Sequence, residues 1–266
     1  MSVAVTRPPA SEDRAKIPAL DPSSELTSRL SARTALYTEL RLLLDAAQAS
    51  EGASYRELVL GQNCLARASA SARAKLWKEL KARYRLDSDD PLFGAFLQEW
   101  RRAGTEAERQ LVAFVFFALN DRLVAQVSKE WLCPLLRIAP TALRPDHLAA
   151  YLNKLLEGDR KAGAWTQETR ARIVRHYLAS IRDFGLAKGT VKKESVRPAL
   201  HGAPIRLLVS ALLLAGTPLL QAVQSPAFKI LGLEGSEAID ALGELNRQGA
   251  LKFKMQGDVV ELEVGA

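Results

Sequence analysis

Capped, amphipathic helical segments follow one another through most of this chain, and they limit its fold more than any other feature. Near the start, large apolar residues recur at spacings of three, four or seven, at Leu26, Leu30, Tyr37, Leu40 and Leu44. Residues at this spacing lie on one face of an α-helix, where they can pack against a core. The pattern predicts a first helix through these residues and favours a mainly α protein.

Cap signals mark where further helices begin. Ser54 with Glu57, and Thr105 with Glu108, have the spacing of a capping box, in which two side chains satisfy unpaired N–H groups of the first helical turn. The second pair opens a strongly apolar helix. Helical patterns continue to residue 156, and Gly158 offers a stop.

An acidic connector, residues 87–90, precedes Pro91. Proline suits the first turn of a helix, here one that runs to about Arg102. Acids in series also occur in metal sites. Because Asp and Ser before a helix cap its N–H groups, and no distant ligand is indicated, we interpret the connector as a cap and expect no metal.

The segment from Asn63 to Leu86 combines charge with helical geometry. It holds seven arginines and lysines against one acid. With Ser71 as the predicted N-cap, Leu76, Leu80 and Tyr84 share an apolar face, and Trp77 flanks them. A cationic stripe lies on another face, formed by Lys75, Lys78, Lys81 and Arg85.

A second basic helix is predicted from about residue 167 to 183. Thr166 is its expected N-cap, and Gly185 is its expected left-handed stop. Its core face is predicted to carry Ile173, Tyr177, Ile181 and Phe184. The other side of the helix and the following loop carry Arg172, Arg175, Arg182, Lys188, Lys192 and Lys193.

Charge is distributed unevenly along the chain. The whole chain has 37 basic and 30 acidic residues, a net charge of +7. Residues 63–86 and 158–197 each carry +6, whereas residues 234–263 carry −4. Such asymmetry points to a polyanionic partner such as nucleic acid, although a basic helix face is often only solvated. The candidate DNA-binding residues are Arg67, Arg73, Lys75, Lys78, Lys81, Arg85, Arg172, Arg175, Arg182, Lys188, Lys192 and Lys193.

The C-terminal part has the order helix, helix, helix, hairpin, which is typical of a winged helix. Pro204 and Pro218 open two helices, Ser236 is the predicted cap of a third that stops at Gly249, and period-2 strands flank a turn at Gly257. A winged helix normally reads DNA with its last helix. Here that helix is acidic, so we expect it to serve packing or partner binding; its acids are Glu237, Asp240 and Glu244.

These patterns predict a mainly α, two-lobed helical bundle with a winged-helix-like C-terminal part. We expect a disordered tail over residues 1–24, an N-terminal helical domain over 25–157 and a C-terminal domain over 158–266. The tail lacks the apolar core and cleavage site of a secretory signal. The apolar run of residues 207–220 is too short to span a bilayer. Cys64 and Cys133 are far apart, and we expect buried thiols in a cytoplasmic protein.

The sequence gives little support for an enzymatic function. The chain has no phosphate-binding G-x-x-x-x-G-K-[ST], no dinucleotide fingerprint and no H-E-x-x-H motif. Its three histidines, His147, His176 and His201, are isolated in sequence, and we interpret His176 as a helix-surface side chain. We therefore expect no enzyme activity, no cofactor and no metal site.

Several of these residues also carry a family resemblance. Asn63 and Leu65 before the Ser71 cap, the Arg83–Tyr84 pair, Trp165 with Thr166, and residues 183–186 resemble the BrxA family of BREX phage-defence systems. The resemblance spans residues 35–264. It implies a mostly helical, two-lobed bacterial cytoplasmic protein whose first lobe is similar to NusB-type bundles. It also implies binding to double-stranded DNA and assistance in excluding phage genomes.

The function expected from these observations is non-catalytic, backbone-dominated binding of double-stranded DNA, with the two basic helices lining one continuous surface. Other proteins of the defence system are possible partners, and no membrane is expected. Two alternatives stay open at this point. One is a helical adaptor whose basic faces meet acidic proteins, and the other is a transcriptional regulator that prefers one operator sequence.

Overall fold

The structure of the protein is a computed structural model that describes residues 15–50, 52–86, 89–200 and 202–265. It confirms a mainly helical architecture with a small antiparallel hairpin near the C-terminus. The α-helices are α1 (Tyr37–Ala49), α2 (Tyr55–Leu60), α3 (Ala70–Tyr84), α4 (Pro91–Arg102), α5 (Glu106–Leu119), α6 (Arg122–Val127), α7 (Cys133–Arg137), α8 (Pro145–Glu157), α9 (Gln167–Asp183), α10 (Gly202–Leu214), α11 (Leu219–Val223) and α12 (Ser236–Arg247).

Short helical turns and two hairpins complete the described fold. The helical turns are η2 (Arg29–Ser31), η3 (Ser128–Leu132), η4 (Ala162–Ala164) and η5 (Pro226–Leu231). One hairpin pairs β1 (Ala187–Lys188) with β2 (Glu194–Ser195), and the other pairs β3 (Lys252–Gln256) with β4 (Val259–Glu263). The second hairpin was predicted from its period-2 pattern, whereas the first was not.

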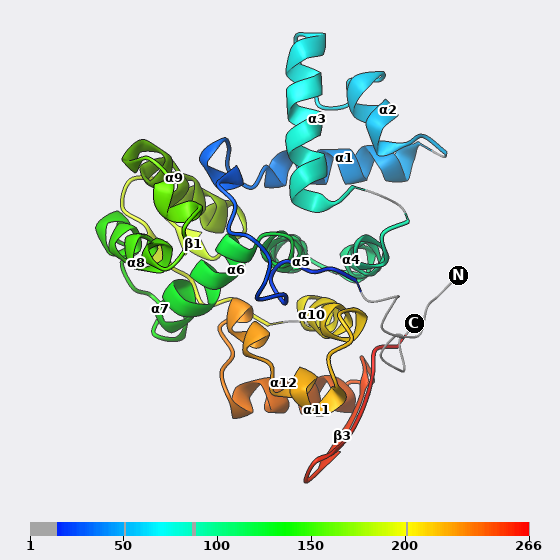
Figure 1. Cartoon of the computed structure of the whole chain (residues 1–266). Coiled ribbons are helices and arrows are strands. Elements are labelled where there is room, and N and C mark those ends of the chain that lie inside the picture. Colours follow the sequence, from blue (N-terminus) through cyan, green and yellow to red (C-terminus); the bar gives the residue numbers. More distant parts are fainter. Residues whose placement is uncertain (1–14, 51, 87–88, 201, 266) are drawn as a thin grey trace.

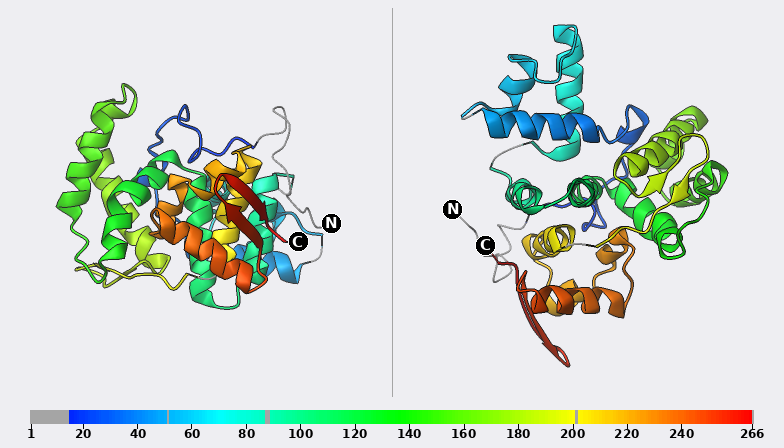
Figure 2. Two further views of the ribbon diagram at one scale, coloured as in Figure 1. Left: turned by 90° about the horizontal axis from the view of Figure 1, so that it is seen from below. Right: turned by 180° about the vertical axis from the view of Figure 1, so that it is seen from behind.

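The helices are arranged around α5 and α10 (Figure 1). α1, α2 and α3 project at one end, and α12 with the β3–β4 hairpin lies at the opposite end. α6 to α9 form a group at one side, as the view from behind also shows (Figure 2). α10 packs against both α4 and α5, and buried apolar side chains form one connected cluster from Ile17 to Val264.

Local cap chemistry explains most helix starts. The side-chain oxygens of Ser54, Thr105 and Thr166 each accept an N–H of the first turn, and Asp90 accepts two just before α4. The N-cap predictions are confirmed, as are the bounds of α9 and the left-handed stop at Gly185. In the predicted capping box of α5, Glu108 accepts the amide of Gly104 and not that of Thr105. Of the acidic connector, residues 87 and 88 lie outside the described residues.

Three predictions about where helices begin were wrong. α3 is capped by Ser69 rather than Ser71, and Gly235 precedes α12, so that Ser236 is its first residue. The first long helix begins at Tyr37, because Leu36 adopts a left-handed backbone (φ 61°) that interrupts helical geometry. Leu26 and Leu30 therefore lie before the helix and not within it, and Leu30 belongs to the η2 turn.

Part of the expected disordered tail is ordered. Residues 1–14 lie outside the described residues, but Ile17 is buried, and the amides of Ala15 and Ala19 donate to carbonyls of α10 and α5. Burial of an isoleucine side chain stabilises a segment by about 2 kcal/mol. This anchor explains why a segment that is polar on average still packs on the core.

The predicted boundary near residue 157 falls between helices that touch. α8 and α9, on either side of it, pack against each other. The division into two domains, the likeness to a NusB-type bundle and the winged-helix character of the C-terminal part stay predictions.

No single helix among the described residues has the length and apolarity required to cross a membrane. One pair, Glu106–Leu119 with Arg122–Arg137, reaches that length only together and is bent by 115°.

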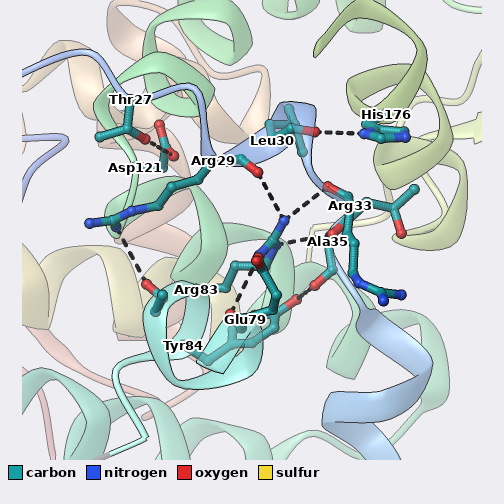
Figure 3. Close-up of polar contacts among 12 residues, drawn as sticks. Thr27, Arg29, Leu30, Arg33, Ala35, Glu79, Arg83, Tyr84, Asp121 and His176 are labelled. Carbon is teal, nitrogen blue, oxygen red and sulfur yellow. Dashed lines mark hydrogen bonds and ion pairs between the residues drawn. The ribbon is translucent and has the colours of Figure 1, made fainter. Parts of the chain in front are cut away.

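A buried arginine holds α3 against the segment that leads into α1 (Figure 3). The Arg83 side chain is 2% exposed. Its guanidinium donates to the backbone carbonyls of Arg29, Arg33 and Thr34 at 3.0–3.1 Å, and it is ion-paired with Glu79. The neighbouring Tyr84 hydroxyl donates to the Ala35 carbonyl at 2.6 Å.

Replacing this arginine should destabilise the protein. In Arg83→Met, three backbone carbonyls and one carboxylate lose the donor that the buried guanidinium supplies, and we expect the free energy of unfolding to fall by about 3 kcal/mol. Urea unfolding followed by circular dichroism measures this. Lys81→Met on the same helix is the control, because Lys81 is exposed and should change stability by less than about 0.5 kcal/mol. Equal urea midpoints for the two variants would contradict the role of Arg83.

Candidate nucleic-acid interface

A group of exposed cations lies on one face of α3. We call Lys75, Lys78 and Lys81 the α3 lysine stripe. All three are exposed, and none makes a hydrogen bond or ion pair with another residue in the described part of the chain. Glu79, the one acid of this basic segment, is turned to Arg83. The stripe therefore presents positive charge that no acid among the described residues neutralises.

The other candidates near α3 are partly occupied. Arg67 is ion-paired with Glu39 at 2.8 Å, and the Nε of Arg85 donates to the Asp90 carboxylate at 2.6 Å. Arg85 also donates to the Lys16 carbonyl at 2.7 Å. Arg73 is half-buried. Of the predicted cations in residues 67–85, only the three lysines are both exposed and without a hydrogen-bond or ion-pair partner among the described residues.

The cations of α9 are exposed but paired. Arg172 and Arg175 share Glu168, at 2.8 and 3.5 Å, with more than half of each arginine side chain exposed. Arg172 beside Glu168 holds the pKa of that carboxyl below its usual range. Arg182 pairs with its neighbour Asp183 at 2.8 Å. Because ion pairs in water are weak, a phosphate can compete with these acids for the guanidinium groups.

The β1–β2 hairpin carries the remaining candidates. Lys188 pairs with Glu194 across the strands at 3.3 Å, and the Lys193 ammonium donates to the Thr190 carbonyl at 2.7 Å. Lys192 is exposed and has no ion pair with a described residue. The hairpin thus extends the basic surface beyond the end of α9.

The two basic helices lie in different parts of the molecule (Figure 1). α3 packs against α2 and α5, whereas α9 packs against α8, β1 and the η2 turn. The η2 segment lies between them, since Arg83 of α3 binds its carbonyls and His176 of α9 lies 2.7 Å from the Leu30 carbonyl (Figure 3).

Two exposed arginines in this connecting segment were missed by sequence reasoning. Arg33 makes no side-chain hydrogen bond or ion pair with a described residue, and the side chain of Arg29 donates to the Ala82 carbonyl at 3.5 Å and lies near the Asp121 carboxyl. Their four-residue spacing was the available signal, but they stand outside both charged runs. They add positive charge to the segment that lies between α3 and α9.

The described residues contain no group of three His, Cys, Asp or Glu side chains that could hold a metal ion. His147 is exposed beside Asp146, and His176 contacts backbone at the η2 turn. His201 lies outside the described residues. Cys133 is buried, and burial raises the pKa of its thiol to about 11.

Comparison with protein families agrees with the resemblance seen in the sequence. The family model of BrxA matches residues 24–210, which is more than half of the chain. This chain belongs to the BrxA family. Membership makes it a protein of BREX phage defence. The match includes every candidate cation of this BrxA protein and ends within α10, before α12 and the β3–β4 hairpin. A search of curated proteins finds no match.

The contrast between paired and unpaired cations predicts different costs of charge reversal. Arg85→Glu removes an ion pair and places a second carboxylate beside Asp90, so we expect a loss of about 1 kcal/mol or more in the free energy of unfolding. Lys78→Glu, on the open face of α3, should change stability by less than about 0.5 kcal/mol. Thermal unfolding of both variants measures the difference, and an equal effect would contradict the assigned pairing.

Proposed function

We propose that this BrxA protein is a non-catalytic, DNA-binding component of a BREX phage-defence system, and that it holds double-stranded DNA largely through backbone phosphates. The observation that carries the proposal is the α3 lysine stripe, Lys75, Lys78 and Lys81. Like charges one helical turn apart repel each other. A polyanion placed on them relieves that repulsion and releases its own condensed counterions.

The dimensions of the stripe fit a DNA backbone. From Lys75 to Lys81, six residues at 1.5 Å per residue span about 9 Å. One strand of B-form DNA presents a phosphate about every 3.4 Å along the helix axis. The stripe can therefore contact about two or three phosphates, and the cations of η2, α9 and the β1–β2 hairpin supply further contacts.

Salt dependence tests this mode of binding. If about five phosphates are neutralised, the logarithm of the affinity should fall against the logarithm of the salt concentration with a slope of about −4.5. Fluorescence anisotropy of a labelled duplex of 30 base pairs, titrated with protein at rising salt, gives the slope. A flat response would remove the proposal.

Neutralising the stripe should weaken binding to all duplexes about equally. For Lys78→Gln with Lys81→Gln, we expect the salt slope to become shallower by about 2, because about two phosphate contacts are lost. The matched control is Lys252→Gln with Lys254→Gln, which removes the same charge from β3, where both lysines face glutamates of β4. If the control lowers affinity as much as the α3 variant, net charge and not the stripe governs binding.

A protein-binding role is a second candidate, and the C-terminal part favours it. A groove of about 510 Å³ between α12 and β3 is lined by Ile239, Phe253 and Met255 together with polar side chains. Asp240 at its rim is exposed. Such a groove suits a partner in the defence complex. Stoichiometric co-purification of another protein without any shift of duplex DNA at low salt would favour this adaptor role.

A regulatory role would show itself differently. A transcriptional regulator should prefer one operator sequence, so competition with unrelated DNA separates that alternative from general backbone binding.

A further inference from the structure

We infer that a pocket between residues 19–22, α6 and the turn that joins α10 to α11 binds a small phosphate monoester. The pocket has a volume of about 470 Å³, which is typical of small-molecule sites. Its lining includes none of the candidate DNA-binding cations. This site is therefore distinct from the proposed nucleic-acid surface, and neither proposal depends on the other.

Segments that are far apart in the sequence form the walls of this pocket. One wall is the start of the described chain, which crosses the core beside α6 and α10 (Figure 1). Hydrogen bonds from the amides of Ala15 and Ala19 join this segment to α10 and α5. The other walls are α6 with η3, the α10–α11 turn and the beginning of η5. The pocket thus depends on the same anchoring that buries Ile17.

A lysine without a partner lies in the pocket wall. Arg122, Gln126 and Lys129 follow one another on the face of α6 and η3 that lines the pocket. Lys129 is half-buried and makes no hydrogen bond or ion pair with a described residue. Burial lowers the pKa of its ammonium group, and the charges of Arg122 and Lys229 lower it further, against the opposing effect of Glu130. Such a charge is costly unless it is paired, so a bound anion would stabilise it.

The acid in the pocket lining is already engaged. Asp21 accepts the amide and the hydroxyl of Ser23 at 2.8 and 2.6 Å, and the hydroxyl of Ser24 at 3.1 Å. The hydrogen bonds from Ser23 hold the pKa of Asp21 below its usual range. Arg122 donates to the Ser24 carbonyl and forms no ion pair with a described residue. Two cations therefore face one occupied carboxylate, and the pocket keeps a positive charge that suits an anion.

The free polar groups of the lining favour a phosphate over a carboxylate. The side chains of Gln126, Thr217 and Gln221 line the pocket and have no hydrogen-bond partner among the described residues. A phosphate monoester carries up to about two negative charges and three strong acceptor oxygens. It can therefore pair with Arg122 and Lys129 together and accept from a hydroxyl or amide as well. A carboxylate has one charge and would leave one of the two cations without a partner.

The apolar part of the lining calls for an organic group on that phosphate. Leu20, Leu212 and Pro226 contribute apolar surface to the pocket. Sites for organic ligands combine apolar walls with a few polar groups that fix orientation. A nucleotide and a sugar phosphate share this chemistry, and binding measurements can separate these two sources.

Isothermal titration calorimetry of the full chain tests the pocket with three separate probes. They are adenosine 5′-monophosphate, glucose 6-phosphate and inorganic phosphate. We expect at least one organic probe to bind roughly tenfold more tightly than inorganic phosphate, because only the organic group buries the apolar walls. Tighter binding of the nucleotide would identify a nucleotide as the source, and tighter binding of glucose 6-phosphate would identify a sugar phosphate.

Variants of the lining locate the bound probe. Lys129→Gln should weaken binding of the tighter probe by roughly tenfold, because a charge-assisted hydrogen bond is lost. Its urea midpoint without ligand should not fall, since the ammonium group has no partner to lose. Gln221→Trp, at an exposed position of the lining, should also weaken binding by filling the pocket without removing a charge. The matched control is Lys154→Gln on the exposed face of α8, which should bind as the wild type does.

Several outcomes would overturn the pocket. They are the failure of every probe to bind, inorganic phosphate binding as tightly as both organic probes, and equal losses in Lys129→Gln and Lys154→Gln. A loss in Lys78→Gln with Lys81→Gln as large as in Lys129→Gln would place the anion on the α3 lysine stripe instead. None of these results bears on the salt dependence of duplex binding, so the proposed function and the pocket can fail separately.

Discussion

The position of the basic surfaces depends on one buried guanidinium. The Arg83 guanidinium donates hydrogen bonds to the backbone carbonyls of Arg29, Arg33 and Thr34. It also forms an ion pair with the carboxylate of Glu79. A buried charge is costly unless it is paired and fully hydrogen-bonded, so this contact tolerates little movement. This contact joins α3 to the segment around η2. The same segment is joined to α9 by two hydrogen bonds, one from the Ala35 amide to the Ser180 hydroxyl and one between the Leu30 carbonyl and the His176 ring. The two basic helices are thereby held at a defined separation.

The same contact decides which charges remain available. Because Glu79 is ion-paired with Arg83, the lysines Lys75, Lys78 and Lys81 have no acid partner among the described residues. On α9 the reverse holds, since Glu168 lies between Arg172 and Arg175. The first surface suits phosphate binding without selectivity. The second surface combines cationic donors with an acidic acceptor, so part of its positive charge is neutralised by Glu168.

Many helix ends and one hairpin are determined by side chains close to them in sequence, so they could be predicted from short sequence patterns. The bounds of α9, the caps at Ser54, Asp90, Thr105 and Thr166, and the β3–β4 hairpin all follow from side chains within a few residues of each end. Where neighbouring residues offer two caps, as Ser69 and Ser71 do, the pattern cannot choose between them. The β1–β2 hairpin was missed because strands of two residues have no period to detect, and their stability comes from distant backbone partners.

The sequence by itself determined the helical class, the basic character of two helices and the family, because propensity, caps and charge are properties of short segments. Only the tertiary structure decided which cations are exposed. Arg83 and Lys81 look alike in the chain, yet one is buried against carbonyls and the other faces solvent. Only the fold brings residue 142 beside residue 194. Backbone hydrogen bonds and ion pairs between remote segments form once hydrophobic packing has placed those segments together, and no local pattern encodes that placement.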